Sequence, residues 1–400
     1  MADHMTRLFD AYDRGRLSRR QLLQALGIGI AVRPVGVLGL GQDPVPNPGR
    51  AQGPGGQRPA GPPPDTTPAP LPFAATGWKT VLLDSISAQA ADYQKEAAFY
   101  AALMGWKVRG DDGKQAVLDI GDWGGFVIRG GYQPPPAPPP PPPAPAAAGD
   151  PNAAGGGGRG GGRGPAPARQ TVVDSFCWGI EPWDTKKVEA ELKTRGLNPV
   201  ADHRGKDFQS FHVKDPDGFD LQISNGGMTN RRRTPATAKT SAAAPFDSTG
   251  WKTVWLDHIS FQCTNYKESV AFYNALLGWK LGRDTGSQNQ CEIGDVGGII
   301  IRRGGGGRGR GPADPNAPAP PRRATIDHIS FGIQPWDPDA VQKALESRGL
   351  PARVDTGGGG DIHTAAFQSY HTTTPNLYDL QISFVTKANR NAGSGPGGGD

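Results

Sequence analysis

The chain repeats itself twice over, and this repetition limits the possible folds more than any other feature. Residues 77–129 recur without a gap as residues 250–302, and both copies begin with Gly-Trp-Lys-Thr-Val. A second repeated segment follows each of these copies. Residues 174–224 match residues 327–383 once a six-residue insertion is allowed. The order is therefore A, B, A′, B′, which a tandem duplication of one two-module unit explains.

Each module has the pattern of a strand, a helix and three further strands. In module A′, polar and apolar residues alternate over 257–263, which is typical of a strand with one buried face. A helix with apolar residues at helical spacing follows and ends at Gly278. Short strands are expected at 279–282, 290–293 and 298–302. The sequence thus predicts an α+β protein of four βαβββ modules.

Glycine and proline mark the segments between the modules. Together they account for 59 and 40 of the 400 residues and are concentrated outside the repeats, where a packed core is not expected. We expect a signal-like segment at 1–36, a disordered spacer at 37–72, a first half at 73–225 (modules 77–132 and 170–225, linker 133–169), a linker at 226–249, a second half at 250–385 (modules 250–303 and 324–385, linker 304–323) and a tail at 386–400.

The N-terminal segment predicts export. Arg19 and Arg20 precede a short, mildly apolar run, which resembles a twin-arginine signal; a surface helix is the alternative. The resemblance implies a periplasmic or otherwise exported protein and the twin-arginine export machinery as a partner. No apolar run approaches the ~20 residues of a membrane-spanning helix.

Charge and cysteine content exclude two classes of protein. The net charge is +5, and much of the basic excess lies in Gly- and Pro-rich stretches, so solvated linkers are favoured over nucleic-acid binding. Cys177, Cys263 and Cys291 lie in apolar runs and are too few for a disulfide framework. We expect three buried free thiols.

The paired modules resemble the vicinal oxygen chelate superfamily, which includes glyoxalases, bleomycin resistance proteins and extradiol dioxygenases. The resemblance rests on Asp-His-Ile-Ser in a first strand, on Phe272-Tyr273 followed by Leu-Gly-Trp, and on an Asp-Pro-Asp-Gly turn that begins at Asp215. It implies that two modules pair into a half-open barrel, so that four modules form two halves. It also implies a divalent metal held in the cavity by side chains of first and last strands.

His258 and His328 are the candidate metal ligands. They occupy equivalent positions on the polar faces of the first strands of A′ and B′, whereas the first half has Ser85 and Ser175 at these positions. Two neutral imidazoles suit Fe, Mn, Zn or Ni. We therefore expect a divalent metal site in the second half and a degenerate site in the first; two ordinary polar histidines are the alternative.

The third ligand departs from the superfamily pattern. The last-strand glutamate of the superfamily falls on Gln381, and on Gln222 in the first half, so a neutral carbonyl replaces a carboxylate. Asp379 shares the face of Gln381 and replaces it if the register differs. His363 and His371 are weaker candidates for acid–base catalysis.

The resemblance leaves three functions open. The first is a metal-dependent enzyme that acts on a small oxygenated molecule, either dioxygenase-like or glyoxalase- or isomerase-like. The second is a metal-free protein that binds a small molecule, as in the bleomycin-resistance branch. The third is an interaction protein that acts through its Pro- and Gly-rich segments.

Overall fold

The computed structural model describes residues 64–134, 168–226, 238–304 and 324–390, apart from residues 122, 205, 206 and 359. All of these residues belong to one compact unit, residues 62–400. The twin-arginine-like pair, Arg19 and Arg20, lies outside the described residues, as do most of the expected spacer and linkers. In the described part of the chain, no helix has the length and apolarity needed to cross a membrane.

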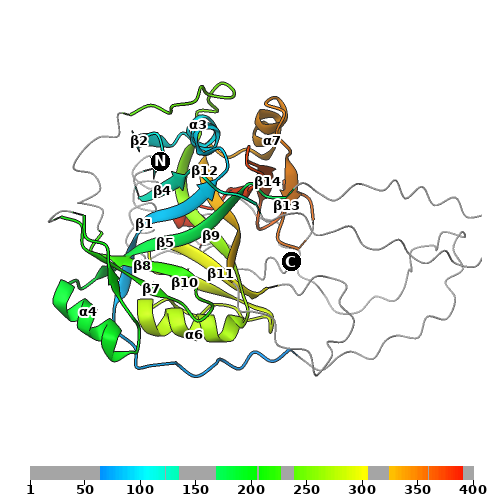
Figure 1. Cartoon of the computed structure of the whole chain (residues 1–400). Coiled ribbons are helices and arrows are strands. Elements are labelled where there is room, and N and C mark those ends of the chain that lie inside the picture. Colours follow the sequence, from blue (N-terminus) through cyan, green and yellow to red (C-terminus); the bar gives the residue numbers. More distant parts are fainter. Residues whose placement is uncertain are drawn as a thin grey trace, which may run out of the picture. The chain divides into compact units, whose positions relative to one another are not determined.

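The first half forms one mixed, eight-stranded sheet with two helices (Figure 1). Its strand order is β2-β3-β4-β1-β5-β8-β7-β6, so the two modules meet where β1 pairs antiparallel with β5. The elements are β1 (Lys79–Ala90), α3 (Tyr93–Met104), β2 (Lys107–Asp111), β3 (Gln115–Ile120), β4 (Gly124–Arg129), β5 (Thr171–Glu181), α4 (Thr185–Thr194), β6 (Val200–Ala201), β7 (Ser210–Lys214) and β8 (Asp220–Ser224).

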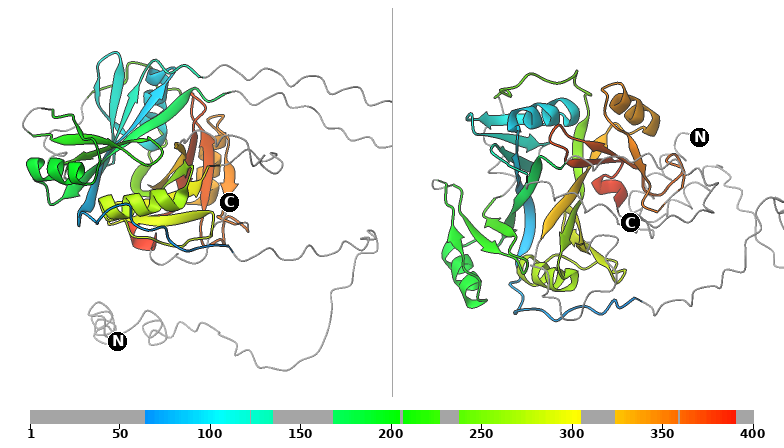
Figure 2. Two further views of the ribbon diagram at one scale, coloured as in Figure 1. Left: turned by 60° about the horizontal axis from the view of Figure 1, so that its bottom comes forward. Right: turned by 45° about the vertical axis from the view of Figure 1, so that its right-hand side comes forward.

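The second half repeats this arrangement in a seven-stranded sheet, and Figure 2 shows both sheets from two sides. Its order is β10-β11-β9-β12-β15-β14-β13, with β9 and β12 antiparallel at the junction of the modules. The predicted α+β class with paired modules is confirmed. The elements are β9 (Lys252–Cys263), α6 (Tyr266–Leu277), β10 (Gln288–Ile293), β11 (Gly297–Arg303), β12 (Thr325–Gln334), α7 (Pro338–Glu346), β13 (Arg353–Asp355), β14 (Ser369–Thr373), β15 (Asp379–Ser383) and the short α8 (Lys387–Arg390).

Module A′ lacks one of its three predicted later strands. Residues 279–282 make only an isolated bridge, Lys280 to Glu292, in place of a ladder. The side chain of Asn289 accepts from the amide of Gly282 at 3.2 Å and donates to its carbonyl at 3.4 Å. Because a side chain takes these backbone groups, they are not available for a regular strand pairing.

The two halves hold each other through matched contacts. The Trp279 indole donates to the Thr80 hydroxyl at 3.0 Å, and the Trp106 indole donates to the Thr253 hydroxyl at 2.9 Å. These four side chains are buried, and each pair joins one half to the other. Since equivalent residues meet in both directions, the halves are related by an approximate two-fold axis, as in a symmetric dimer.

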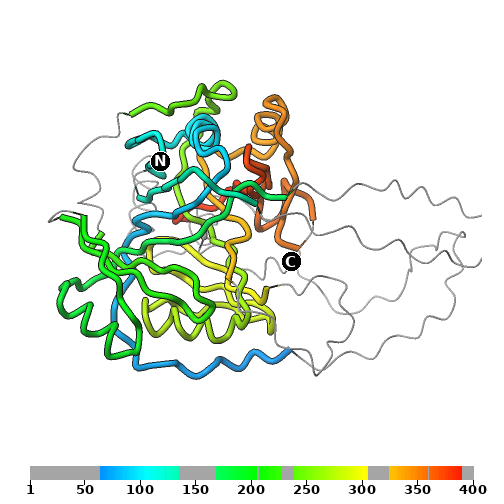
Figure 3. Tube along the Cα trace, in the orientation of Figure 1, coloured from blue at the N-terminus to red at the C-terminus, as the bar shows by residue number. Residues whose placement is uncertain are grey.

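Two segments expected to be loose pack against the opposite half. The described end of the expected spacer, residues 64–72, follows α6, where Lys267 pairs with Asp65 at 2.6 Å (Figure 3, blue segment). Phe73, the first residue of the expected first half, packs on Phe272 with ring centroids 5.7 Å apart. The equivalent residue before the second half, Phe246, packs on Phe99 at the same separation. Both segments are therefore in contact with a helix of the other half.

Candidate metal site in the second half

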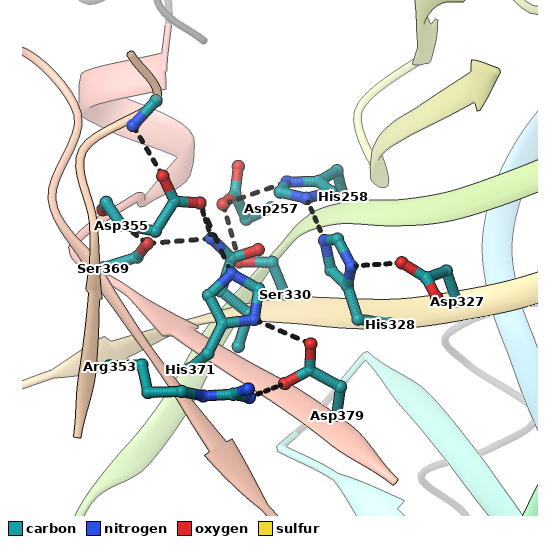
Figure 4. A network of polar contacts seen from close by, with 12 residues as sticks. Asp257, His258, Asp327, His328, Ser330, Arg353, Asp355, Ser369, His371 and Asp379 are labelled. Atoms are coloured by element: carbon teal, nitrogen blue, oxygen red, sulfur yellow. Dashed lines mark hydrogen bonds and ion pairs between the residues drawn. The ribbon is translucent and has the colours of Figure 1, made fainter. Parts of the chain in front are cut away.

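The histidine pair, His258 and His328, lies at the junction of the two modules in the second sheet. Its two Nε2 atoms face each other at 3.2 Å, and the rings are nearly perpendicular, as Figure 4 shows. The strand register explains the approach, because His258 pairs with Ser330 while His328 pairs with Ser260 on the same face. Both imidazoles are largely shielded from solvent, with side chains 12% and 10% exposed.

An aspartate holds the far side of each ring. Asp257 Oδ2 lies 3.3 Å from Nδ1 of His258, and Asp327 Oδ2 lies 3.3 Å from Nδ1 of His328. A carboxylate beside Nδ1 favours the tautomer with the proton on Nδ1, which leaves the Nε2 lone pair free. Burial lowers the pKa of His328, and the neighbouring His258 and His371 lower it further, so this ring is neutral at pH 7.

β-Bulges bring each aspartate onto the same side as its histidine. Between β9 and β12 the register slips once at Asp257 and once at Asp327, so each is an extra residue opposite a single partner. Simple alternation along a strand would place consecutive side chains on opposite faces. Alternation therefore does not predict either aspartate at the site, although an Asp-His pair is present in both first strands.

Gln381 lies on β15, the strand next to β12 in the sheet. Its amide nitrogen donates to Asp355 Oδ2 at 2.9 Å and to Ser369 Oγ at 2.8 Å. The residue is 1% exposed, and its carbonyl oxygen is buried without a hydrogen-bond partner. In register, Gln381 pairs with Ser330, which in turn pairs with His258. A buried, unpaired carbonyl oxygen is a suitable third metal ligand.

The register alternative, Asp379, is engaged elsewhere. It pairs with Arg353 at 2.6 Å and with Nδ1 of His371 at 3.1 Å. Burial lowers the pKa of His371, but its hydrogen bonds to Asp355 and Asp379 outweigh this effect and raise the pKa to about 9. His371 is therefore an imidazolium at pH 7 and has no free lone pair for a metal. Its ring centroid lies 5.0 Å from that of His328, close enough to orient or protonate a bound molecule.

His363 lies apart from these residues. It is exposed and bonds to Asp361 and Asp339, each at 2.9 Å, on the side of α7. The structure thus brings His258, His328, Gln381 and His371 to one region but leaves His363 at the surface.

The first half keeps the same network but lacks the histidine pair. Gln222 donates to Asp202 at 3.2 Å and to Ser210 at 2.8 Å, and His212 bonds to Asp220 at 2.7 Å. Cys177, paired with Ser85 on the neighbouring strand, is a buried free thiol, as are the other two cysteines. The two halves therefore differ at the histidine positions, where the first half has Ser85 and Ser175, while Gln222 and His212 keep carboxylate partners.

The separation of the two Nε2 atoms fits a shared cation. Two nitrogens bound to one tetrahedral zinc at ~2.0–2.1 Å are about 3.3 Å apart. Two free lone pairs at 3.2 Å repel each other unless a metal or a proton lies between them. Among the described residues, however, no three His, Cys, Asp or Glu side chains converge to hold a metal. The donor set is thus two imidazoles and a neutral carbonyl, which is a weak but acceptable set for Fe, Mn, Zn or Ni.

Comparison with known proteins finds a family model that matches part of the second half. Residues 255–375 match the model of the Glyoxalase/Bleomycin resistance protein/Dioxygenase superfamily. The second half carries the sequence pattern of this superfamily. The matched segment includes the histidine pair and His371, and it ends before Gln381. No curated protein matches the sequence.

Several solved structures of enzymes are similar in fold. A Mn(II)-bound glyoxalase from Novosphingobium aromaticivorans aligns with a TM-score of 0.49 and 15% identity, over 76% of this chain and 82% of that chain. A 2,3-dioxygenase from Pseudomonas sp. KL28 gives a TM-score of 0.48 and 13% identity, over 76% and 92%. An extradiol ring-cleaving dioxygenase from B. fuscum gives 0.47 and 15%, over 81% and 75%.

Proposed function

We propose that the second half binds a divalent metal ion through His258 and His328, with the carbonyl oxygen of Gln381 as the third protein ligand. The observation that supports this most directly is the 3.2 Å approach of the two Nε2 atoms, each opposite an Nδ1 that faces a carboxylate. We propose further that the protein is an enzyme that acts on a small oxygenated molecule, in a dioxygenase-like or a glyoxalase- or isomerase-like reaction.

The residues of such a site would have three different roles. Three protein ligands leave coordination positions open, and a metal there supplies Lewis acidity to a bound oxygen. His371, held as an imidazolium by Asp355 and Asp379, supplies a positive charge and a proton close to His328. Asp257 and Asp327 orient the ligand rings and make them better donors.

The first experiment is a comparison of metal content between matched variants of the two halves. We expect purified protein incubated with Mn²⁺ or Zn²⁺ to retain one equivalent, measured by elemental analysis after desalting. His258→Ala should lose most of it, because only one imidazole and one neutral carbonyl remain. Ser85→Ala, the equivalent change in the first half, should retain the metal.

A metal-free binding protein is the second candidate. The 3.2 Å contact also fits an N–H···N hydrogen bond between two neutral imidazoles. Wild-type protein that stays metal-free after incubation with Fe²⁺, Mn²⁺, Zn²⁺ and Ni²⁺ would establish this reading and reject the enzyme proposal.

A further inference from the structure

Arg169 is the residue through which the first half reaches the metal site of the second. It lies two residues before β5, yet its guanidinium donates to Asp327 Oδ1 at 3.1 Å. It also lies over the ring of Tyr378, 5.6 Å from its centroid. The adjacent amide, that of Gln170, donates to the carbonyl of Asn376 at 2.9 Å. The segment is therefore anchored on the second half at three points.

Asp327 divides its two oxygens between Arg169 and the metal site. Oδ1 accepts from Arg169, while Oδ2 faces Nδ1 of His328 at 3.3 Å. Asp327 is also a bulge residue, so regular strand pairing does not fix the direction of its side chain. Because Arg169 holds Oδ1 of Asp327, it also fixes the direction of Oδ2.

The equivalent aspartate in the first half is held differently. Within the described residues, Asp174 accepts from Arg129 at 2.5 Å and from Gln89 at 2.9 Å, and both of these partners belong to its own half. Asp174 has a serine next to it, Ser175, where Asp327 has His328. Arg169 of the first half thus contacts Asp327, the aspartate that faces His328, and not its equivalent Asp174.

We propose that Arg169 is a positioning residue for the metal site, acting across the two halves through Asp327 on His328. The proposal rests on the proposed metal binding. It gives the first half, which lacks the histidine pair, a role in the function of the second half. Removing the Arg169 charge would by itself favour a cation. That effect is weakened by solvent, because the side chain is 39% exposed, and the loss of orientation should dominate.

The test is a titration of the full-length protein with Co²⁺, followed by the visible absorption of the bound ion. Removing a group that orients a metal ligand typically weakens binding 10- to 100-fold, and Arg169→Gln should weaken it about tenfold. Arg169→Lys, which keeps a charged donor, should restore part of the affinity. Arg129→Gln removes an arginine from Asp174, the equivalent of Asp327 in the first half, and should leave Co²⁺ affinity unchanged.

A double-mutant cycle separates positioning from a general loss of structure. Asp327→Asn alone should weaken Co²⁺ binding, and adding Arg169→Gln should weaken it no further, because Arg169 acts through Asp327. Additive losses, or an Arg169→Gln protein that binds Co²⁺ as tightly as wild type, would overturn the proposal while the metal site stands. Wild-type protein that binds no Co²⁺ would overturn both.

Discussion

At the level of single residues, the candidate site has an amide, Gln381, where a carboxylate ligand was expected, although other carboxylates lie nearby. The last strand offers Gln381 where a charged ligand would bind metal more tightly, yet its amide is held by Asp355 at 2.9 Å. Asp355 is strongly acidic, because its hydrogen bond to His371 lowers its pKa to about 2. Glutamine is thus the side chain that can face both a metal and a carboxylate.

This arrangement predicts that Gln381→Glu makes folding depend on metal. Without metal, the new carboxylate faces Asp355 at hydrogen-bond distance, which should cost about 1–3 kcal/mol of unfolding free energy. With Mn²⁺ or Zn²⁺, the added charge should tighten binding and recover the loss. Thermal unfolding with and without metal measures both effects. Gln222→Glu, the matched change beside Asp202, should lose stability and should not regain it when metal is added. Stability regained with metal in Gln222→Glu, or not regained in Gln381→Glu, would contradict this prediction.

Residue patterns in the sequence predicted part of this site. Alternation along the strands placed His258, His328 and Gln381 on one side of the sheet, and the structure brings the two imidazoles together. The same alternation predicted the wrong side for Asp257 and Asp327. A bulge turns one residue to the other side of the strand, and the residue pattern does not reveal it. Asp355 was missed as well, since only the pairing of β13 with β14 brings it beside Ser369.

At the scale of the element, the turn before β15 is strained in the second half and relaxed in the first. Leu377 has φ 61°, a left-handed conformation that favours glycine, and the first half has Gly218 with φ 82° at the equivalent place. Asn376 holds the turn through hydrogen bonds to Glu96 and Asp92 of the first half. The strand that carries Gln381 therefore starts from a turn that the other half stabilises.

Exchanging the two turn residues should have opposite effects. Leu377→Gly relieves a left-handed conformation that costs ~1–2 kcal/mol, partly offset by the greater freedom of glycine in the unfolded chain. We expect a gain of about 0.5 kcal/mol in unfolding free energy. Gly218→Leu imposes the strain and should cost about 1 kcal/mol. Urea denaturation measures both; a destabilised Leu377→Gly protein would show that packing of the leucine outweighs its strain.

The elements themselves were largely predictable from the repeats. In module A′ the first strand, the helix and two of the three later strands lie near the predicted positions, because apolar periodicity and a helix-ending glycine mark them. Asp337 caps α7, since its side chain accepts from the amide of Ala340 at 2.8 Å. The strand expected at 279–282 was wrong, because the side chain of Asn289 competes for its backbone, and periodicity does not report such a contact.

At the scale of the whole molecule, the two halves share buried polar contacts. Asp215, at the turn before β8, accepts from the Tyr273 hydroxyl of α6 at 3.0 Å and is 5% exposed. Burial raises the pKa of this carboxyl to about 6, although hydrogen bonds to backbone amides and to Tyr273 act in the opposite direction. The interface between the halves therefore contains a group that titrates near neutral pH.

This group makes stability depend on pH in a definite direction. The folded protein holds the Asp215 proton up to about pH 6, whereas the unfolded chain loses it near pH 3.8. Its contribution to stability is thus complete below pH 3.8 and is lost as the pH rises through 6, by about 3 kcal/mol. Urea denaturation of wild type and Asp215→Asn at pH 4 and pH 8 checks this. The variant should show a smaller difference; an unchanged difference, or one matched by the exposed Asp295→Asn control, would contradict it.

X-ray absorption spectroscopy of the Zn²⁺-loaded protein measures whether His258 and His328 bind one metal ion. We expect scattering from two imidazoles, with zinc–nitrogen distances of ~2.0–2.1 Å, and oxygen ligands in the remaining positions. His328→Ala should leave one imidazole. Oxygen atoms as the only ligands, or an unchanged spectrum for His328→Ala, would show that the two histidines do not hold the metal.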